Sequence, residues 1–162
     1  MASRLVMAAL LPLAMTAAFQ ARAGDVEDCF NDATLRQTEP AKAAAACRRL
    51  AEQGDARAQG IMGVLYAYGE GVSQDFVEVA TWYRKAADQG NAKAQYHLGL
   101  MYAKGRSVPK DLVQALMWLD LAAAQGDALA ARSGDQVAAK MTPAQIKEAE
   151  ARIAAWKPTL SQ

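Results

Sequence analysis

Apolar residues recur along most of this chain at the spacing of helix faces. After Gly54, positions 58, 62, 65, 66 and 69 follow the i, i+4, i+7, i+8 pattern of one buried helix face. Further on, a second face combines large and small apolar residues: Val79, Trp82, Tyr83, Ala86 and Ala87. Tryptophan supplies buried area and alanine allows close packing, so the two faces predict a pair of helices packed on each other.

The same pattern recurs 36 residues later, and part of it recurs once more. Gln53-Gly54-Asp55-Ala56 is followed by Gln89-Gly90-Asn91-Ala92 and by Gln125-Gly126-Asp127-Ala128. This register also aligns other punctuating or bulky residues: Gly63 with Gly99, Tyr66 with Tyr102, Gly69 with Gly105, Asp75 with Asp111 and Trp82 with Trp118. A period of about 20 to 50 residues is typical of a solenoid.

Turn and cap residues divide each period into two helices. Gly54, Gly90 and Gly126 suit the left-handed residue that ends a helix, and the Asp or Asn after each is a preferred N-cap. The second helices should begin with capping boxes, formed by Asp75 with Glu78 and by Asp111 with Gln114. Inside the first helices glycine recurs at a cost of about 1 kcal/mol relative to alanine, so a neighbouring helix should approach closely at Gly63 and Gly99.

The two ends extend this pattern in degenerate form. Residues 41–52 look like a second helix, and the third copy has Asp135 in the place of the interior glycines. Thr142 and Gln145 indicate another capping box, with Pro143 at the first helical position, for a helix running to about Trp156. We therefore predict an all-α fold, an α/α solenoid of antiparallel helix pairs. It should contain about four units: a degenerate one at 24–53, repeats at 54–89 and 90–125, and a partial repeat with a capping helix at 126–162.

A long motif runs from Ala58 to Gly90: A-x-x-x-x-G-x-x-Y-x-x-G-x-G-V-x-x-D-x(6)-W-Y-x-x-A-A-x-Q-G. It resembles the Sel1-like repeat, a relative of the tetratricopeptide repeat, and residues 140–146, K-M-T-P-A-Q-I, resemble the ends of many secreted members. The resemblance covers roughly residues 40–157 and implies a right-handed superhelix with a concave surface for proteins or peptides. The second copy departs from it at Ser107, where the first has Gly71, so a positive φ there would strain or reshape the loop.

The first 23 residues have the features of a secretory signal. Arg4 precedes an apolar run from Leu5 to Ala18, and Ala21-Arg22-Ala23 fits a cleavage site. That run is too short to span a bilayer, and no later stretch is longer, so we expect a periplasmic or secreted protein without a membrane span. Cleavage would leave a formal charge of about −1, which argues against nucleic acid as the main partner.

Cys29 and Cys47 are the two cysteines of the chain. An even count in an oxidising compartment favours one disulfide over two buried free thiols, and a metal site is disfavoured because His97, the single histidine, lies far away. In repeat register Cys29 falls on the first helix and Cys47 on the second, so a bridge would join the helices of the weakest unit. Closing this loop would stabilise the fold by about 3 kcal/mol.

A helix projection also identifies a candidate binding surface. Opposite the buried face lie Arg57, Gly60, Val64 and Tyr68, repeated as Lys93, Tyr96, Leu100 and Lys104. Such a mixture of basic, aromatic and aliphatic groups recurs at interfaces. The alternative is that these residues are merely solvated, or that Val64 and Leu100 pack on the next helix.

The resemblance to the Sel1-like repeat implies a non-catalytic adaptor or regulator in the bacterial cell envelope. His97 aligns with Ile61 at the edge of the apolar stripe, which is typical of a packed residue, and Ser73, Thr81 and Ser133 lack an accompanying His/Asp arrangement. We expect no cofactor, a protein or peptide partner, and a monomer. The alternative, drawn from cysteine-rich secreted members of the resembled family, is a hydrolase or binder of β-lactams or cell-wall fragments; a structural envelope component would differ from the adaptor only in its partner.

Overall fold

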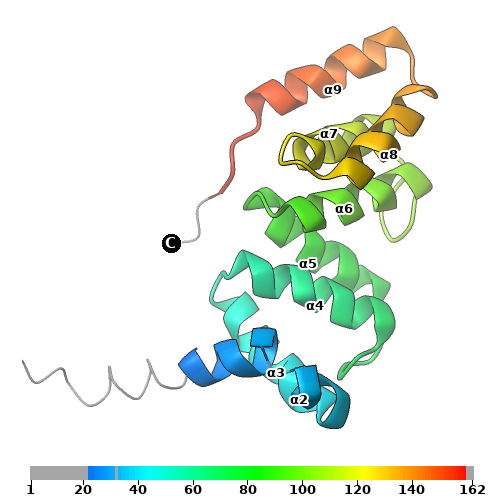
Figure 1. Cartoon of the computed structure of the whole chain (residues 1–162). Coiled ribbons are helices and arrows are strands. Elements are labelled where there is room, and N and C mark those ends of the chain that lie inside the picture. Colours follow the sequence, from blue (N-terminus) through cyan, green and yellow to red (C-terminus); the bar gives the residue numbers. More distant parts are fainter. Residues whose placement is uncertain (1–21, 32, 160–162) are drawn as a thin grey trace, which may run out of the picture.

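A computed structural model describes residues 22–31 and 33–159, which form a stack of helices (Figure 1). Apart from Arg22 and Ala23, the predicted signal segment lies outside these residues. Within the described ranges there is no β-strand, and none of the helices has the length and apolar character of a membrane span. The elements are η1 (Glu27–Asn31, a π-helical turn), α2 (Ala33–Thr38), α3 (Pro40–Glu52), α4 (Ala56–Tyr68), α5 (Phe76–Asp88), α6 (Ala92–Lys104), α7 (Leu112–Ala123), α8 (Ala128–Ala138) and α9 (Pro143–Ala155). The predicted all-α fold is confirmed.

The joints between successive units have the predicted geometry. Gly54, Gly90 and Gly126 have φ values of 91°, 89° and 94°. The side chain after each glycine caps the next helix by accepting from backbone N–H groups in its first turn: Asp55 for α4, Asn91 for α6 and Asp127 for α8. These short connections reverse the chain and place consecutive helices side by side.

Of the capping boxes predicted for the second helices, the Asp caps are confirmed and the return bonds are wrong. Asp75 and Asp111 do cap α5 and α7 with their carboxylates. Their own backbone N–H groups, however, donate to the carbonyls of Tyr66 and Tyr102 at 3.2 and 3.1 Å. The return bond from Glu78 or Gln114 that completes a capping box is therefore replaced by a bond to the preceding helix. At Thr142 and Gln145 both bonds are present, and α9 ends before Trp156 as predicted.

The loops inside the two repeats keep one shape although a residue differs. Gly71 has a φ of 71° and Ser107 a φ of 61°. Ser107 therefore holds the left-handed conformation, which costs a non-glycine residue about 1–2 kcal/mol. Gly71 meets a second constraint, because a Cβ atom there would lie 2.1 Å from the carbonyl oxygen of Pro40. The second loop is thus strained and not reshaped.

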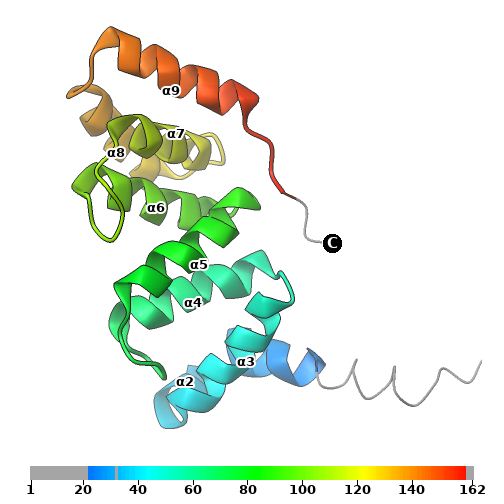
Figure 2. The same cartoon turned by 180° about the vertical axis from the view of Figure 1, so that it is seen from behind.

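Each helix packs on the next, from α3 to α8 (Figures 1 and 2). The interior glycines allow the close approach that the sequence predicts. A Cβ atom at Gly63 would lie 2.5 Å from Cε1 of Tyr83 on α5, and one at Gly99 would lie 2.7 Å from Cγ of Leu119 on α7. Trp82 and Trp118, at equivalent positions, belong to two separate buried clusters, one toward the N-terminal unit and a larger one toward the C-terminal unit.

Two sets of polar contacts repeat with the fold. In the first set, buried glutamines link three helices: Gln59 donates to the Ala51 carbonyl and accepts from Gln89, and Gln95 donates to the Ala87 carbonyl and accepts from Gln125. In the second set, an arginine of one unit donates to a tyrosine hydroxyl of the next: Arg48 to Tyr66 and Arg84 to Tyr102. Both sets join a second helix to the first helix of the following unit, so they hold neighbouring units in register.

The N-terminal unit replaces its first helix by short pieces. Residues 22–26, η1 and α2 together occupy this place. A disulfide joins Cys29 of η1 to Cys47 of α3, and the Arg49 guanidinium pairs with Asp25. A covalent link and an ion pair thus attach the irregular segment to α3.

The C-terminal unit ends in a helix that packs mainly on α7, two elements back. Beyond α9, the Trp156 ring meets the Trp118 ring edge-on at 6.4 Å, and the Thr159 N–H donates to the Asp88 carbonyl at 2.8 Å. In α8, the first helix of the third copy, Asp135 is exposed at the position of Gly63 and Gly99. The close approach falls on the buried Gly134, where a Cβ atom would lie 2.9 Å from an Asp120 carboxylate oxygen.

Candidate functional site

Two adjoining hollows form a groove between α4 and α6. The first has a volume of about 480 Å³ and lies toward the N-terminal ends of the two helices, near Arg57 and Lys93. The second, of about 420 Å³, lies toward their C-terminal ends, near Tyr68 and Lys104. Both are lined by Val64, Tyr83 and His97, so they meet over a shared floor. We call this surface the α4–α6 groove.

Tyr83 of α5 forms the floor because the helix in front of it carries small residues. Gly60 stands where the second repeat has Tyr96, and Gly63 lies directly against the Tyr83 ring. Burial raises the pKa of Tyr83 to about 12, so its phenol stays protonated. Tyr83 lines both hollows although only 5 % of it is exposed, and within the described part of the chain its hydroxyl makes no hydrogen bond.

His97 covers this floor through ring contacts. Its imidazole stacks on Tyr83 with ring centres 5.0 Å apart and planes 15° apart, and Tyr96 packs beside it at 5.2 Å. Burial lowers the pKa of His97, and Lys93 lowers it further against the opposing effect of Asp127. The ring is therefore neutral at pH 7. Among the described residues no group of His, Cys, Asp and Glu side chains has the arrangement of a metal site.

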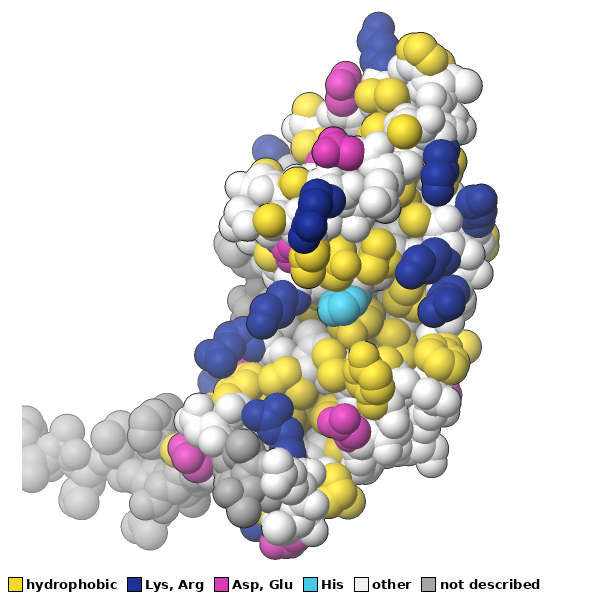
Figure 3. Space-filling model, turned by 45° about the vertical axis from the view of Figure 1, so that its right-hand side comes forward, with side chains coloured by type: hydrophobic (Ala, Val, Ile, Leu, Met, Phe, Trp, Pro, Cys, Tyr) yellow, Lys and Arg dark blue, Asp and Glu magenta, His cyan; other side chains and the backbone are white. Residues whose placement is uncertain are grey.

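The charged side chains that line the groove are all positive. Arg57 and Lys93 line the first hollow, and Lys104 and Arg106 line the second, while neither lining includes an Asp or Glu. Figure 3 shows this face, with the histidine among hydrophobic side chains and with Lys and Arg on both sides of it. Because the whole chain is nearly neutral, with a formal charge of +1, this gathering of cations is a local feature.

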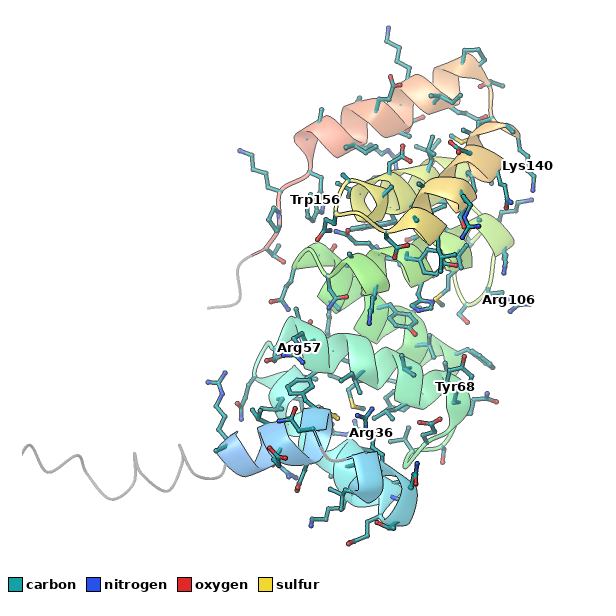
Figure 4. The ribbon with its side chains drawn as sticks, in the orientation of Figure 1. Arg36, Arg57, Tyr68, Arg106, Lys140 and Trp156 are labelled. Carbon is teal, nitrogen blue, oxygen red and sulfur yellow. A yellow bond between two sulfur atoms is a disulfide. The ribbon has the colours of Figure 1, made fainter. Side chains whose placement is uncertain are left out.

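Exposed aromatic side chains border the second hollow. Tyr68 is 74 % exposed and Phe76 is 54 % exposed. Figure 4 shows Arg57 and Tyr68 at opposite ends of α4, with Arg106 on the same side of the molecule as Tyr68. Aromatic residues of this kind are enriched at protein interfaces.

The structure brings most of the predicted surface residues together. Six of them line the groove: Arg57, Val64, Tyr68, Lys93, Leu100 and Lys104. Tyr96 lies beside His97, outside the two linings. The Arg57 guanidinium is also placed, because it stacks over the Phe30 ring at 4.4 Å. Whether these residues bind a partner stays a prediction.

Several groove residues were missed by the helix projection. Tyr83 and Phe76 come from α5, whose residues the sequence assigns to the core or to a cap, and His97 was interpreted as a packed residue at the stripe edge. The signal in the sequence was Gly60 in the place of the bulky Tyr96, because the missing side chain leaves room for the first hollow; Tyr83 itself is buried, at 5 % exposed.

Comparisons with known proteins agree with this fold. The sequence model of the family described as Sel1 repeat matches residues 56–91 and 92–127. No sequence among the curated proteins matches the chain significantly. One similar crystal structure is that of a protective antigen present in uropathogenic Escherichia coli strains, which displays an SLR fold; the TM-score is 0.71 and the identity 32%, over 86% of this chain and 29% of that one.

A second similar crystal structure is that of a Sel1 repeat protein from Oxalobacter formigenes. Its TM-score is 0.66 and its identity 35%, over 76% of this chain and 37% of that one. The chain thus spans less than two fifths of the length of either protein. Sel1 repeats generally mediate protein interactions and are generally non-catalytic. The chain thus contains two Sel1 repeats, in a helical solenoid similar to the solved structures of Sel1 repeat proteins.

Proposed function

We propose that this chain is a non-catalytic adaptor that holds a protein partner in the α4–α6 groove. The observation that carries the proposal is the groove itself, with an apolar floor, exposed aromatic residues at its border and a free tyrosine hydroxyl at its base. Buried anchors surrounded by a polar border are typical of binding interfaces. Packed helices on both sides hold this surface in place without a partner, which lowers the entropy lost on binding.

We further propose that this adaptor works in the cell envelope. The disulfide between Cys29 and Cys47 supports an oxidising compartment, because such bonds persist mainly outside the cytoplasm. The signal-like pattern of residues 1–23 supports the same location. Detection of free thiols in protein isolated from intact cells would contradict this placement.

Site-specific crosslinking tests the binding surface. A photo-crosslinking amino acid at position 68, which is exposed at the groove border, should capture a partner in living cells. The same amino acid at position 147, exposed on α9, is the matched control and should capture none above background. Equal capture at both positions would remove the groove from consideration.

Charge placed on the groove should abolish this capture. Phe76→Glu, made with the crosslinking amino acid at position 68, is the first variant, because a 54 % exposed side chain can be changed without affecting the fold. Leu100→Glu, at a half-buried position, is the second, and its thermal unfolding is measured alongside to confirm that it folds. If purified protein instead hydrolysed β-lactams or cell-wall fragments, and His97→Ile removed that activity, the protein would be an enzyme.

A further inference from the structure

The charges that line the groove identify the chemistry of its partner, provided that the groove is the binding face proposed above. Two cations stand at each end: Arg57 and Lys93 at one, Lys104 and Arg106 at the other. The acidic group that acts on the pKa of His97 is Asp127, whose carboxylate caps α8 by accepting from two backbone N–H groups. Asp55, next to Arg57, is used in the same way for α4. A ligand in the groove therefore faces cations that no carboxylate of the lining neutralises.

The helix geometry gives the distance between these cations. Lys93 and Lys104 begin and end one face of α6 and are 11 residues apart, which corresponds to about 16 Å along the helix axis. An extended chain advances about 3.3 Å per residue, so about five residues cover this span. The two charged ends can thus be reached at once by one short extended segment.

The middle of the groove offers a different chemistry. Val64, Leu100 and the stacked rings of Tyr83 and His97 form an apolar floor, and the neutral imidazole adds no charge there. The Tyr83 hydroxyl can donate to a carbonyl oxygen of a chain lying across it. This arrangement fits a polypeptide better than a nucleic acid or an anionic polysaccharide, which would place charge along its whole length.

We propose that the groove binds an extended acidic segment of a partner protein, with apolar side chains on the Tyr83–His97 floor and carboxylates at both ends. The Arg57–Lys93 end should hold the more acidic part of the segment. It lies at the N-terminal ends of α4 and α6, where the helix dipoles also favour anions, whereas the C-terminal ends near Lys104 disfavour them.

Three fluorescent peptides of one length test this inference on the purified full chain. The first has the sequence Glu-Glu-Leu-Phe-Leu-Glu-Glu, the second replaces each Glu by Lys, and the third replaces the three apolar residues by Ser. We expect the first to bind at least about tenfold more tightly than either of the others, with an affinity that falls as salt is added. No binding by the first peptide, or equal binding by its lysine counterpart, would overturn the inference.

Charge reversal locates the interaction. Lys93→Glu combined with Lys104→Glu should lower the affinity for the acidic peptide by about tenfold and raise the affinity for the basic one. Each reversal replaces an attraction to the acidic peptide by a repulsion. Lys147→Glu combined with Lys157→Glu changes the net charge equally at exposed positions outside the groove, and should leave affinity within about twofold. Equal losses in both double variants would show a general charge effect and contradict the inference.

The same double variants separate this inference from the adaptor proposal. If Phe76→Glu abolishes capture in cells while reversal at Lys93 and Lys104 leaves it intact, the groove binds a partner that is not acidic. Single-stranded DNA and a sulfated polysaccharide are titrated in parallel, and tighter binding of either than of the acidic peptide would also exclude the proposed partner.

Discussion

The two matched repeats have the same backbone fold, but they differ in how far the side chains at equivalent positions are buried. In the second repeat, Leu119 and Val113 are buried, and Tyr96 fills the outer face of α6. In the first repeat their equivalents are Tyr83, Val77 and Gly60. Tyr83 is also buried, at 5 % exposed, but it lines the groove, whereas Val77 is 69 % exposed and Gly60 has no side chain. The next helix packs on α5 and on α7 alike, as α6 and α8, but α7 also packs on α9, and α5 has no such additional helix among the described elements.

This difference separates two tasks that the same motif performs. Residues that fix the turns and the close approach of helices are identical or nearly so in both copies, such as Gly63 and Gly99 or Asp75 and Asp111. Residues that differ, such as Gly60 and Tyr96, lie on a helix face that takes no part in these turns and close contacts. A binding surface can therefore arise in one repeat while the other serves the core.

Exchanging the loop residues at 71 and 107 should give the largest difference in stability between the two repeats. Gly71→Ser should cost at least about 2 kcal/mol, since it adds left-handed strain and a clash with the Pro40 carbonyl. Ser107→Gly removes strain without creating a contact and should stabilise by about 0.5 kcal/mol after the entropy of glycine is counted. Thermal unfolding of both variants measures the difference, and equal shifts would contradict the account of Gly71.

Alanine at the interior glycines sharpens the comparison at the helix contacts. Gly99→Ala should destabilise by about 1–3 kcal/mol, because the new methyl meets buried Leu119 and the Ala115 carbonyl oxygen at 3.1 Å. Gly63→Ala should cost less, since the Tyr83 ring can move into the groove. Denaturant unfolding gives both values, and peptide binding should weaken in Gly63→Ala alone. A larger loss of stability in Gly63→Ala would mean that the Tyr83 ring is not free to move.

A pH titration should show the smallest difference. His97 has a lowered pKa in the folded state, so the stability it contributes is complete above pH 6.5 and is lost as pH falls through the folded-state pKa. His97→Ile, which copies the first repeat, should make unfolding less sensitive to acid between pH 7 and 5. The measurement is the melting temperature of both proteins across this range; parallel curves would show that His97 titrates alike in both states.

Most helix boundaries could be predicted from the sequence, because they depend on contacts between residues close together in the chain. The Gly-Asp and Gly-Asn joints, the Asp caps and the Thr142–Gln145 box act within a few residues, so the sequence alone located helix ends to within a residue or two. The capping boxes at Asp75 and Asp111 were predicted wrongly because the competing acceptor, a tyrosine carbonyl, belongs to another helix. The groove floor was missed for the same reason, since a projection of α4 alone cannot show that Tyr83 of α5 lines the hollows beside it.

The repeated glutamine and arginine–tyrosine contacts have a consequence for how the solenoid unfolds. Stability in such arrays is approximately a sum of unit energies and nearest-neighbour coupling energies. Both polar contacts are lost at the last interface, where Ala131, Asp120 and Ala138 stand in register with Gln95, Arg84 and Tyr102. Burial and the nearby charges of Asp135 and Glu150 raise the pKa of Asp120, so its ionised form opposes the contact. The interface between α7 and α8 therefore depends on apolar packing without these two polar contacts, and we expect amide exchange to show less protection in α8 than in α6.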